Sequence, residues 1–216
     1  MTRSVNYLLT AILIVSMILV GVSYAGSGCC DNQKNQSQEN ESSDPRATQF
    51  TLTNYDGQDV SLADFDGKVV VLEWLNYDCP FVKYHYETAS TMEDLANKYA
   101  DKGVVWLAIN STNYATSETN KEFAKKNSVP YPILDDHKGN VGHAYGAQRT
   151  PELFIIDKNG QIAYHGAIDN APLGKLSEGQ TEKINYVDNA LTELLAGKEI
   201  SVPQTKPYGC TVKYSK

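Results

Sequence analysis

The chain has 216 residues, a formal net charge of −7 and four cysteines, and 41% of its residues are hydrophobic. This length fits one domain with additional segments, and the hydrophobic content is sufficient for a packed core. The acidic balance, without a cluster of Lys and Arg, argues against nucleic acid as a partner, because phosphate binding needs clustered positive charge.

Residues 1–25 form a predicted leader. The stretch Tyr7–Ala25 carries no charge, its apolar centre has the length of a signal-peptide hydrophobic region, and Ser23-Tyr24-Ala25 fits a cleavage site. The leader is therefore either a cleaved signal peptide or an uncleaved membrane anchor, and lipidation of Cys29 or Cys30 is a third alternative. Each alternative predicts export of the domain to the periplasm, to the outside of the cell or to a membrane facing away from the cytoplasm.

Residues 26–46 are polar, of low complexity and without an aliphatic or aromatic side chain to bury. This composition predicts a disordered tether. Cys29 and Cys30 are neighbours in it, and vicinal cysteines do not easily bridge each other without strain, so a redox role for them is not favoured. The remaining residues, 47–216, are predicted to form one folded domain.

Strand and helix patterns alternate along the folded part. Alternating apolar and polar residues around an Asp-Gly turn predict an N-terminal β-hairpin over residues 49–62. Continuous apolar runs predict buried strands, and apolar residues at helical spacing predict helices. The predicted strands cover residues 68–75, 103–110 and, as a pair, 151–166; the predicted helices cover 80–101, 116–127 and 181–197. This order predicts an α/β fold with a mixed central sheet flanked by helices.

Cys79 falls between a predicted buried strand and the next predicted helix. Reactive sites in open α/β sheets lie beyond the carboxyl ends of strands, and unpaired N–H groups at a helix N-terminus favour a thiolate over a thiol. Pro80 suits the first helical position, and Lys83 one turn later would add positive charge, whereas Asp78 would oppose it. A reactive thiol is the favoured interpretation; an inert buried cysteine is the alternative.

The quoted segment "FTLTNYDGQDVSLADFDGKVVVLEWLNYDCPFVK", residues 50–83, resembles the opening of the redoxin group, the AhpC/TSA-type and peroxiredoxin-like members of the thioredoxin superfamily. The likeness continues in "GAQRTPELFIIDKNGQIAYHGAIDN" and in the tail "LLAGKEISVPQTKPYGCTVKY". It covers about residues 47–214. The resemblance implies a thioredoxin-like fold in which Cys79 is the nucleophile.

The same resemblance implies roles for residues 149–151, at the start of the predicted strand pair 151–166, and for Pro80. Thr150-Pro151 matches the family's cis-proline position, which lies against the reactive cysteine and exposes the backbone of the preceding residue to a bound substrate strand. Thr150, Pro151 and Pro80 are therefore predicted to shape a substrate groove. Arg149 is predicted to stabilise a thiolate, as an Arg does in peroxiredoxins; a solvated surface charge is the alternative.

Three departures from related motifs narrow the chemistry around Cys79. Peroxiredoxins carry a Thr three positions before the cysteine, where this chain has Asn76. Thioredoxins carry a second cysteine three positions after it, where this chain has Val82. Copper-delivery relatives use a cysteine four positions after it, where this chain has Lys83. The sequence thus favours disulfide exchange over peroxide reduction and provides no local dithiol.

Cys210 lies in a tail punctuated by Gly and Pro. It is a candidate resolving thiol for an oxidised Cys79, or the partner of Cys79 in a static disulfide, or the partner of Cys29 or Cys30 on the tether. A relationship between Cys79 and Cys210 is favoured, because no other cysteine lies in the folded domain.

The predicted function is an exported thiol-disulfide oxidoreductase. A thiol peroxidase with antioxidant activity and a non-catalytic tethered binding domain are the alternatives. The expected partners are thiols and disulfides of proteins or small molecules, with peroxide in the peroxidase alternative. No cofactor is expected, and no metal site is predicted, because the four histidines lack paired ligand spacing.

Overall fold

The computed structural model describes residues 46–176 and 178–215. The predicted leader and all but the last residue of the predicted tether lie outside these residues. Within the described ranges, no helix combines the length and the hydropathy needed to cross a membrane.

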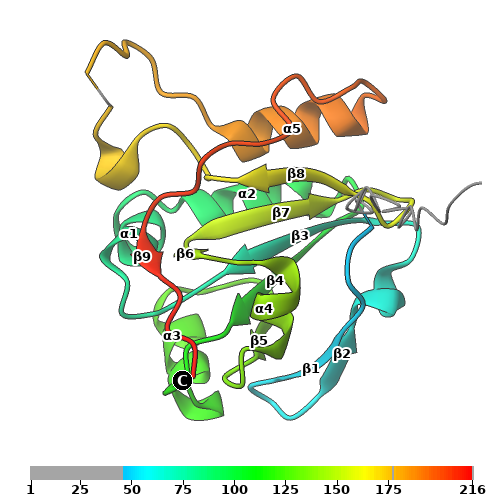
Figure 1. Ribbon diagram of the computed structural model, residues 1–216, viewed down its shortest axis with the longest axis vertical. Helices are drawn as coiled ribbons and strands as arrows, with labels where there is room; N and C mark the ends of the chain where they lie inside the picture. The colour runs from blue at the N-terminus through cyan, green and yellow to red at the C-terminus, as the bar shows by residue number, and fades with distance from the viewer. Residues whose placement is uncertain (1–45, 177, 216) are drawn as a thin grey trace, which may run out of the picture. The chain divides into compact units, whose positions relative to one another are not determined.

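A seven-stranded mixed sheet forms the centre of the fold, in the order β2-β1-β5-β4-β3-β7-β8 (Figure 1). β3 pairs with β4 in parallel and with β7 antiparallel, and β4 pairs with β5 in parallel. The strands of this sheet are β1 (Thr51–Asn54), β2 (Asp59–Ser61), β3 (Val69–Trp74), β4 (Val104–Asn110), β5 (Ile133–Asp135), β7 (Glu152–Ile156) and β8 (Ile162–Gly166). The predicted mixed sheet and the predicted N-terminal hairpin, β1 with β2, are both confirmed.

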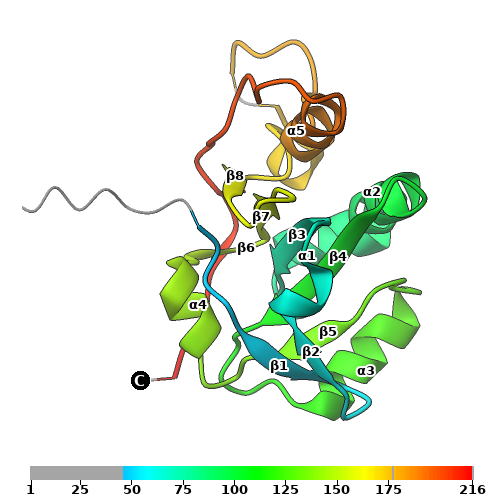
Figure 2. The same ribbon diagram turned by 90° about the vertical axis from the view of Figure 1, so that its right-hand side faces the viewer.

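Helices cover both faces of this sheet. They are η1 (Leu62–Phe65), α1 (Pro80–Lys83), η2 (Tyr84–Thr88), α2 (Thr91–Ala100), α3 (Ser117–Lys126), α4 (Asn140–Tyr145), η3 (Pro172–Gly174) and α5 (Tyr186–Leu195). Figure 2 shows α2 and α4 on opposite sides of β3. The two faces explain why β3 reads as an uninterrupted apolar run: every one of its residues is buried.

Alternate side chains of β3 enter two separate apolar clusters. Val71 packs with residues of α1, α2, α3 and α5, and Cys79 belongs to the same cluster. Leu72 and Trp74 pack on the other face, with α4 and the segment before β1. Each fully buried side chain of this size contributes about 1.5–3 kcal/mol to folding. The strand that leads to Cys79 is therefore held from both sides.

The predicted helix 80–101 is broken in the structure. The first α-helical turn, α1, widens into the π-helix η2, in which the N–H of Ala89 donates to the carbonyl of Tyr84 at 2.9 Å. Ser90 then adopts a left-handed conformation, φ +47°, and α2 begins. Apolar spacing alone did not reveal the break, because the buried apolar residues on both sides of it belong to the same cluster.

Three further differences concern short or irregular segments. The predicted helix 181–197 begins only at Tyr186, where the side chain of Asn185 caps it by accepting from the N–H of Asp188 at 2.9 Å. β5 and α4 were not predicted. Nor were β6 (Arg149–Thr150) and β9 (Cys210–Thr211), which form a separate two-stranded sheet. Two-residue strands have too few side chains to show a period.

Candidate functional site around Cys79 and Cys210

Cys79 lies in the turn between β3 and α1, at the predicted strand-to-helix junction. Its backbone N–H donates to the carbonyl of Asn76 at 3.0 Å, and Pro80 takes the first position of α1. Its thiol donates to the carbonyl oxygen of Thr150, with an Sγ–O distance of 2.9 Å. The residue is only 2% exposed. The cysteine therefore lies beyond the carboxyl end of β3, a central strand, and is covered by other atoms of the chain.

The loop that covers Cys79 contains the peptide bond Thr150-Pro151, which is cis, as the resemblance implied. Both residues are buried. The carboxylate of Glu152, itself buried, accepts from the backbone N–H groups of Gln148 and Arg149, each at 2.7 Å. Glu152 thus fixes the loop on which the carbonyl of Thr150 is presented to the thiol.

Cys210 is brought to this loop by the pairing of β6 with β9. Thr150 and Cys210 are opposite residues of this antiparallel ladder. Both Cys79 and Cys210 are free thiols. The pKa of Cys210 is raised to about 11, first by burial and then by a hydrogen bond with Cys79 and by the charge of Cys79. The two predicted site cysteines are therefore direct neighbours.

The two predicted stabilising cations lie at the rim. The ammonium group of Lys83 is 4.0 Å from Asp78 Oδ1, and both side chains are about half exposed, 45% and 56%. Such exposed pairs contribute little. Arg149 donates from Nη1 to Thr211 Oγ1 at 2.9 Å, and its positive charge slightly lowers the pKa of Cys210, against the larger causes that raise it. Stabilisation of a Cys79 thiolate by either cation stays a prediction.

A polar network links η2 to the tail that carries Cys210. Tyr208 donates its hydroxyl to Asp169 Oδ1 at 2.7 Å, and His85 Nε2 lies 2.9 Å from the same hydroxyl. Because that hydroxyl has a single proton, His85 is the Nε2–H donor, and its Nδ1 accepts from Thr91 Oγ1 at 3.1 Å. Lys183 Nζ lies 3.0 Å from Asp169 Oδ2. The sequence did not indicate this hydrogen-bonded network, because its members are far apart in the sequence.

The other histidines have local partners, and His165 also stacks on Phe154 with ring centres 4.2 Å apart. His137 Nδ1 lies 2.9 Å from Asp135 Oδ1, His165 Nε2 lies 2.6 Å from Glu152 Oε1, and His143 stacks on Tyr214. In residues 46–176 and 178–215, no group of three or more His, Cys, Asp or Glu side chains is arranged to hold a metal ion. The histidines therefore serve as local hydrogen-bonding and packing groups in the described structure.

Glu73 is a fully buried acid on β3, and sequence reasoning did not single it out. Its carboxylate accepts from Tyr86 at 2.8 Å, from Tyr131 at 3.1 Å and from Trp106 Nε1 at 3.1 Å. Burial raises its pKa to about 7, against the lowering effect of these three donors, and the charge of Glu93 raises it slightly further. The signal available in the sequence was a lone carboxylate inside the apolar run "KVVVLEWL".

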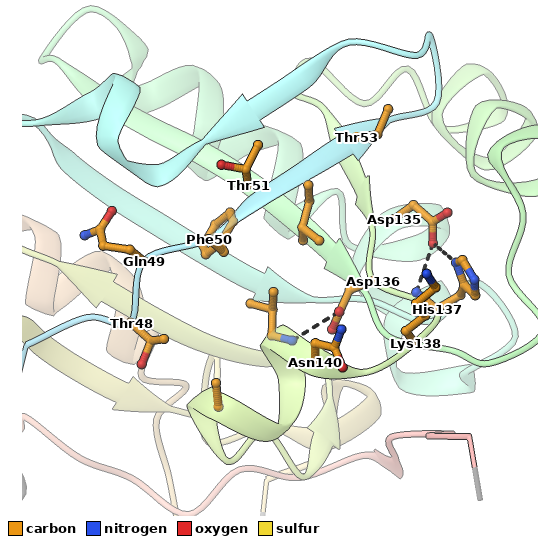
Figure 3. Close-up of a pocket in the computed structure, with 13 residues that line it drawn as sticks. Thr48, Gln49, Phe50, Thr51, Thr53, Asp135, Asp136, His137, Lys138 and Asn140 are labelled. Carbon is orange, nitrogen blue, oxygen red and sulfur yellow. Dashed lines mark hydrogen bonds and ion pairs between the residues drawn. The ribbon is translucent and has the colours of Figure 1, made fainter.

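A cavity of about 450 Å³ lies away from the two thiols, between β1 and the turn before α4 (Figure 3). Asp136 in its wall accepts from the N–H groups of Val141 and Gly142 and from the hydroxyl of Ser111, so its carboxylate is satisfied by the protein. None of the residues that line the cavity is a predicted site residue. The chemistry of the cysteines is therefore not located in this cavity.

Comparison with known proteins shows that most residues of this site lie in a region that matches one protein family. Residues 44–165 match the model of the AhpC/TSA family. The matched region contains Cys79, Thr150 and Pro151, and it ends before Cys210.

Among curated proteins, the chain is similar to the thiol-disulfide oxidoreductase ResA of Bacillus thuringiensis subsp. konkukian (strain 97-27), with 31% identity over 116 residues. It is also similar to the thioredoxin-like protein YneN of Bacillus subtilis (strain 168), with 34% identity over 118 residues. Each alignment covers 54% of this chain. The chain spans 64% of the length of ResA and 66% of the length of YneN.

Two solved structures share most of the fold. An uncharacterized conserved protein from Geobacillus kaustophilus superposes with a TM-score of 0.70 and 31% identity, over 79% of this chain and 90% of that one. A hypothetical protein from Sinorhizobium meliloti 1021 superposes with a TM-score of 0.68 and 28% identity, over 79% of this chain and 93% of that one. The likeness extends well beyond the strand that leads to Cys79.

Proposed function

This chain belongs to the AhpC/TSA family, and we propose that it acts as a thiol-disulfide oxidoreductase in which Cys79 is the nucleophile and Cys210 its partner thiol. One observation carries the proposal: the β6–β9 ladder sets Cys210 opposite Thr150, whose carbonyl accepts the thiol hydrogen bond of Cys79. Two thiols that meet in this way can form and release a disulfide by exchange. The similarity to ResA supports the same chemistry.

The proposed reaction has two exchange steps. The thiolate of Cys79 attacks one sulfur of a substrate disulfide, so that a mixed disulfide forms and the other substrate sulfur leaves as a thiolate. The thiolate of Cys210 then attacks Cys79 Sγ, which releases the second substrate thiolate and leaves a Cys79–Cys210 disulfide. The substrate gains two electrons and the cysteine pair loses two. A dithiol reductant returns the pair to its starting state, and the reverse sequence oxidises a substrate dithiol.

The groups around the thiols have proposed positioning roles. The carbonyl of Thr150 orients the Cys79 thiol, and Pro151 and Pro80 shape the surface on each side of it. The raised pKa of Cys210 suits a second, resolving thiol. That thiol needs its proton while the mixed disulfide forms, and it loses the proton only when it attacks.

The proposed substrates are disulfides of proteins or small molecules. We further propose that the domain works outside the cytoplasm, on the basis of the leader pattern in residues 1–25, in which the stretch Tyr7–Ala25 carries no charge. Disulfide chemistry is favoured in such compartments. A thiol peroxidase is the second candidate on family grounds, but Asn76 stands where peroxiredoxins carry the peroxide-binding Thr.

The proposal is tested with a peptide joined by a disulfide to a chromogenic aromatic thiol. All proteins in this test carry Cys29→Ser and Cys30→Ser, so that only Cys79 and Cys210 can react. The reduced protein with both Cys79 and Cys210, taken here as wild type, should release the aromatic thiol and then the peptide thiol, and finish with Cys79 bonded to Cys210. Cys210→Ser should release the aromatic thiol and stop as a peptide–Cys79 mixed disulfide, visible by mass. Cys79→Ser, the matched control, should not react above the buffer rate. Reaction of Cys79→Ser at the wild-type rate, or full peptide release by Cys210→Ser, contradicts the assignment.

A further inference from the structure

Residues 203–214, here called the strap, run along one edge of the domain past β8 and β6 (red in Figure 1). At its start, the carbonyl of Pro203 accepts from the N–H of His165 at 3.0 Å, and the N–H of Thr205 donates to the carbonyl of His165 at 3.0 Å. Thr205 Oγ1 also accepts from the N–H of Ala167 at 2.9 Å. The strap therefore leaves the edge of β8 as an added extended segment.

The end of the strap is anchored as well. The N–H of Val212 donates to the carbonyl of Gln148 at 3.0 Å, and the side chain of Val212 is buried. Tyr214 donates its hydroxyl to the carbonyl of Ala147 at 2.7 Å and stacks on His143 with ring centres 4.0 Å apart. The strap is thus held at both ends, on either side of Thr150.

Between these anchors the strap lies directly over the reactive site. Gly209 has φ +114°, and a Cβ atom at this position would overlap the carbonyl oxygen of Thr150, the oxygen that accepts the Cys79 thiol. Cys210 then pairs with Thr150. The close backbone approach at Gly209 is what lets an extended chain cover the thiol, which is 2% exposed.

The strap is not packed continuously against the body. A cavity of about 430 Å³ lies between Gln204–Pro207 of the strap and the side chains of Gln148, Glu152 and His165. Apolar contact is therefore small under Gln204–Pro207, whereas the later residues Tyr208, Cys210, Val212 and Tyr214 pack against the apolar clusters of the body. Because segments with few buried apolar contacts open at lower free energy, opening is expected to begin at Gln204–Pro207. Exposure of Cys79 then also requires the hydrogen bond of Tyr208 to Asp169 to break.

We infer that the strap occupies the groove that an extended, disulfide-bearing polypeptide substrate takes when it reacts, so that the strap and the substrate replace each other on the backbone of Thr150. The inference rests on the proposed function for the identity of the substrate. Its geometric support is independent of that function. β9 pairs with β6 in a short antiparallel ladder, Gly209 lies against the carbonyl of Thr150, and the strap places Cys210 next to Cys79. An added strand uses the same backbone groups whether it comes from the chain itself or from another polypeptide.

This exchange of occupants links resolution to release. With the strap open, the substrate strand lies against Thr150 and its disulfide faces Cys79. When the strap returns, Cys210 arrives at Cys79 Sγ and displaces the substrate sulfur, and β9 takes back the backbone positions that the substrate strand held. Breaking the mixed disulfide and expelling the substrate are then one movement. A small disulfide that does not reach the Thr150 backbone needs less opening than a polypeptide.

Gly209→Ala tests the strap without altering either thiol. The added Cβ should lift the strap, so that N-ethylmaleimide alkylates Cys79 about tenfold faster than in the wild type, and the amides of Thr205 and Val212 should exchange with deuterium faster. Gly160→Ala is the matched control, because Gly160 also has a positive φ, +78°, but nothing within 4 Å of an added Cβ. Unchanged exchange of the β3 amides reports an intact fold.

A second measurement does not depend on Gly209→Ala. Cys210→Ser protein that also carries Cys29→Ser and Cys30→Ser is linked through Cys79 either to an extended peptide or to 2-mercaptoethanol, and deuterium exchange of the strap is compared. The peptide adduct should expose the amides of Thr205 and Val212, and the small adduct should leave them closer to the wild type. Equal protection in the two adducts, or wild-type alkylation of Cys79 in Gly209→Ala, overturns the inference. If Gly209→Ala is alkylated faster but the protein does not undergo thiol-disulfide exchange with peptide disulfides, the inference about the strap holds and only the proposed function is overturned.

Discussion

Thr150 and Cys210 are opposite residues of the two-stranded β6–β9 ladder. The same Thr150 accepts the Cys79 thiol through its carbonyl oxygen at 2.9 Å. One backbone unit therefore holds the positions of both thiols, one through a side-chain hydrogen bond and the other through strand pairing. Changes at the β6–β9 ladder are expected to alter how the thiols meet more than how reactive either one is by itself.

Disulfides are expected to oxidise Cys79 faster than hydrogen peroxide does. Peroxide cleavage needs donors placed around the peroxide, and Asn76 stands where peroxiredoxins have Thr, whereas disulfide exchange needs an accessible thiolate and a second thiol. Stopped-flow rates with oxidised glutathione, a peptide disulfide and peroxide on one reduced sample give the order. If peroxide reacts far faster and Cys210 then condenses with the sulfenic acid, the peroxidase alternative replaces the proposed function. If no reagent oxidises Cys79 in the folded protein, a non-catalytic binding domain replaces both.

Alkylation of Cys210 should shift to lower pH when Cys79 is replaced. Burial is the first cause of the raised pKa of Cys210, about 11, and the hydrogen bond and charge of Cys79 are the next. Cys79→Ala removes the second and third causes and leaves the first, so the pH–rate midpoint should move down but stay above that of a free thiol. Mass analysis of the Cys210 peptide after iodoacetamide pulses gives both profiles. Superimposable profiles would show that the thiols do not interact.

Glu73→Gln should change how stability depends on pH. The folded-state pKa of Glu73 is about 7 against 4.5 for an ordinary Glu, so the folded protein binds the proton more tightly. Its contribution is present below pH 4.5 and is lost as the pH rises to about 7, with a total on the order of 3 kcal/mol. As the pH rises through this window, the free energy of unfolding measured in urea should therefore increase for Glu73→Gln relative to the wild type. Glu122→Gln, at an exposed site, is the control, and parallel curves for Glu73→Gln and wild type would contradict the expectation.

His85→Gln should have the opposite effect. Burial lowers the pKa of His85 from 6.5 to about 4, against the raising effect of Asp169, so the unfolded chain binds the proton more tightly. The stabilising contribution of neutral His85 is present above pH 6.5 and is lost as the pH falls towards 4. Wild-type stability should therefore fall relative to His85→Gln on acidification, by on the order of 3 kcal/mol.

The windows of Glu73 and His85 overlap with opposite signs, so the wild-type curve alone does not separate them. Each variant is read against the wild type at the same pH, with His137→Gln as the control for His85. A difference between wild type and His85→Gln that stays constant from pH 7 down to pH 4 would show that His85 does not titrate in this way.

The sequence by itself determined the features that depend on neighbouring residues. The continuous apolar run of β3, the alternation in the N-terminal hairpin and the position of Cys79 before Pro80 are all local patterns, because strand burial and helix starts are set by the next few side chains. The cis bond before Pro151 followed from family likeness in a local motif. These patterns were sufficient to predict the mixed α/β fold. They were also sufficient to predict the position of Cys79 between a strand and a helix.

Only the tertiary structure decided what lies over that thiol. The two residues of β9 carry no period, and the close approach of Gly209 to Thr150 depends on a backbone far away in the sequence. The same holds for the contact of His85 with Tyr208 and for the donors around Glu73. Such contacts form when the ends of long loops are brought together, and the packing of the whole domain, not the local sequence, offsets the entropy that this closure costs.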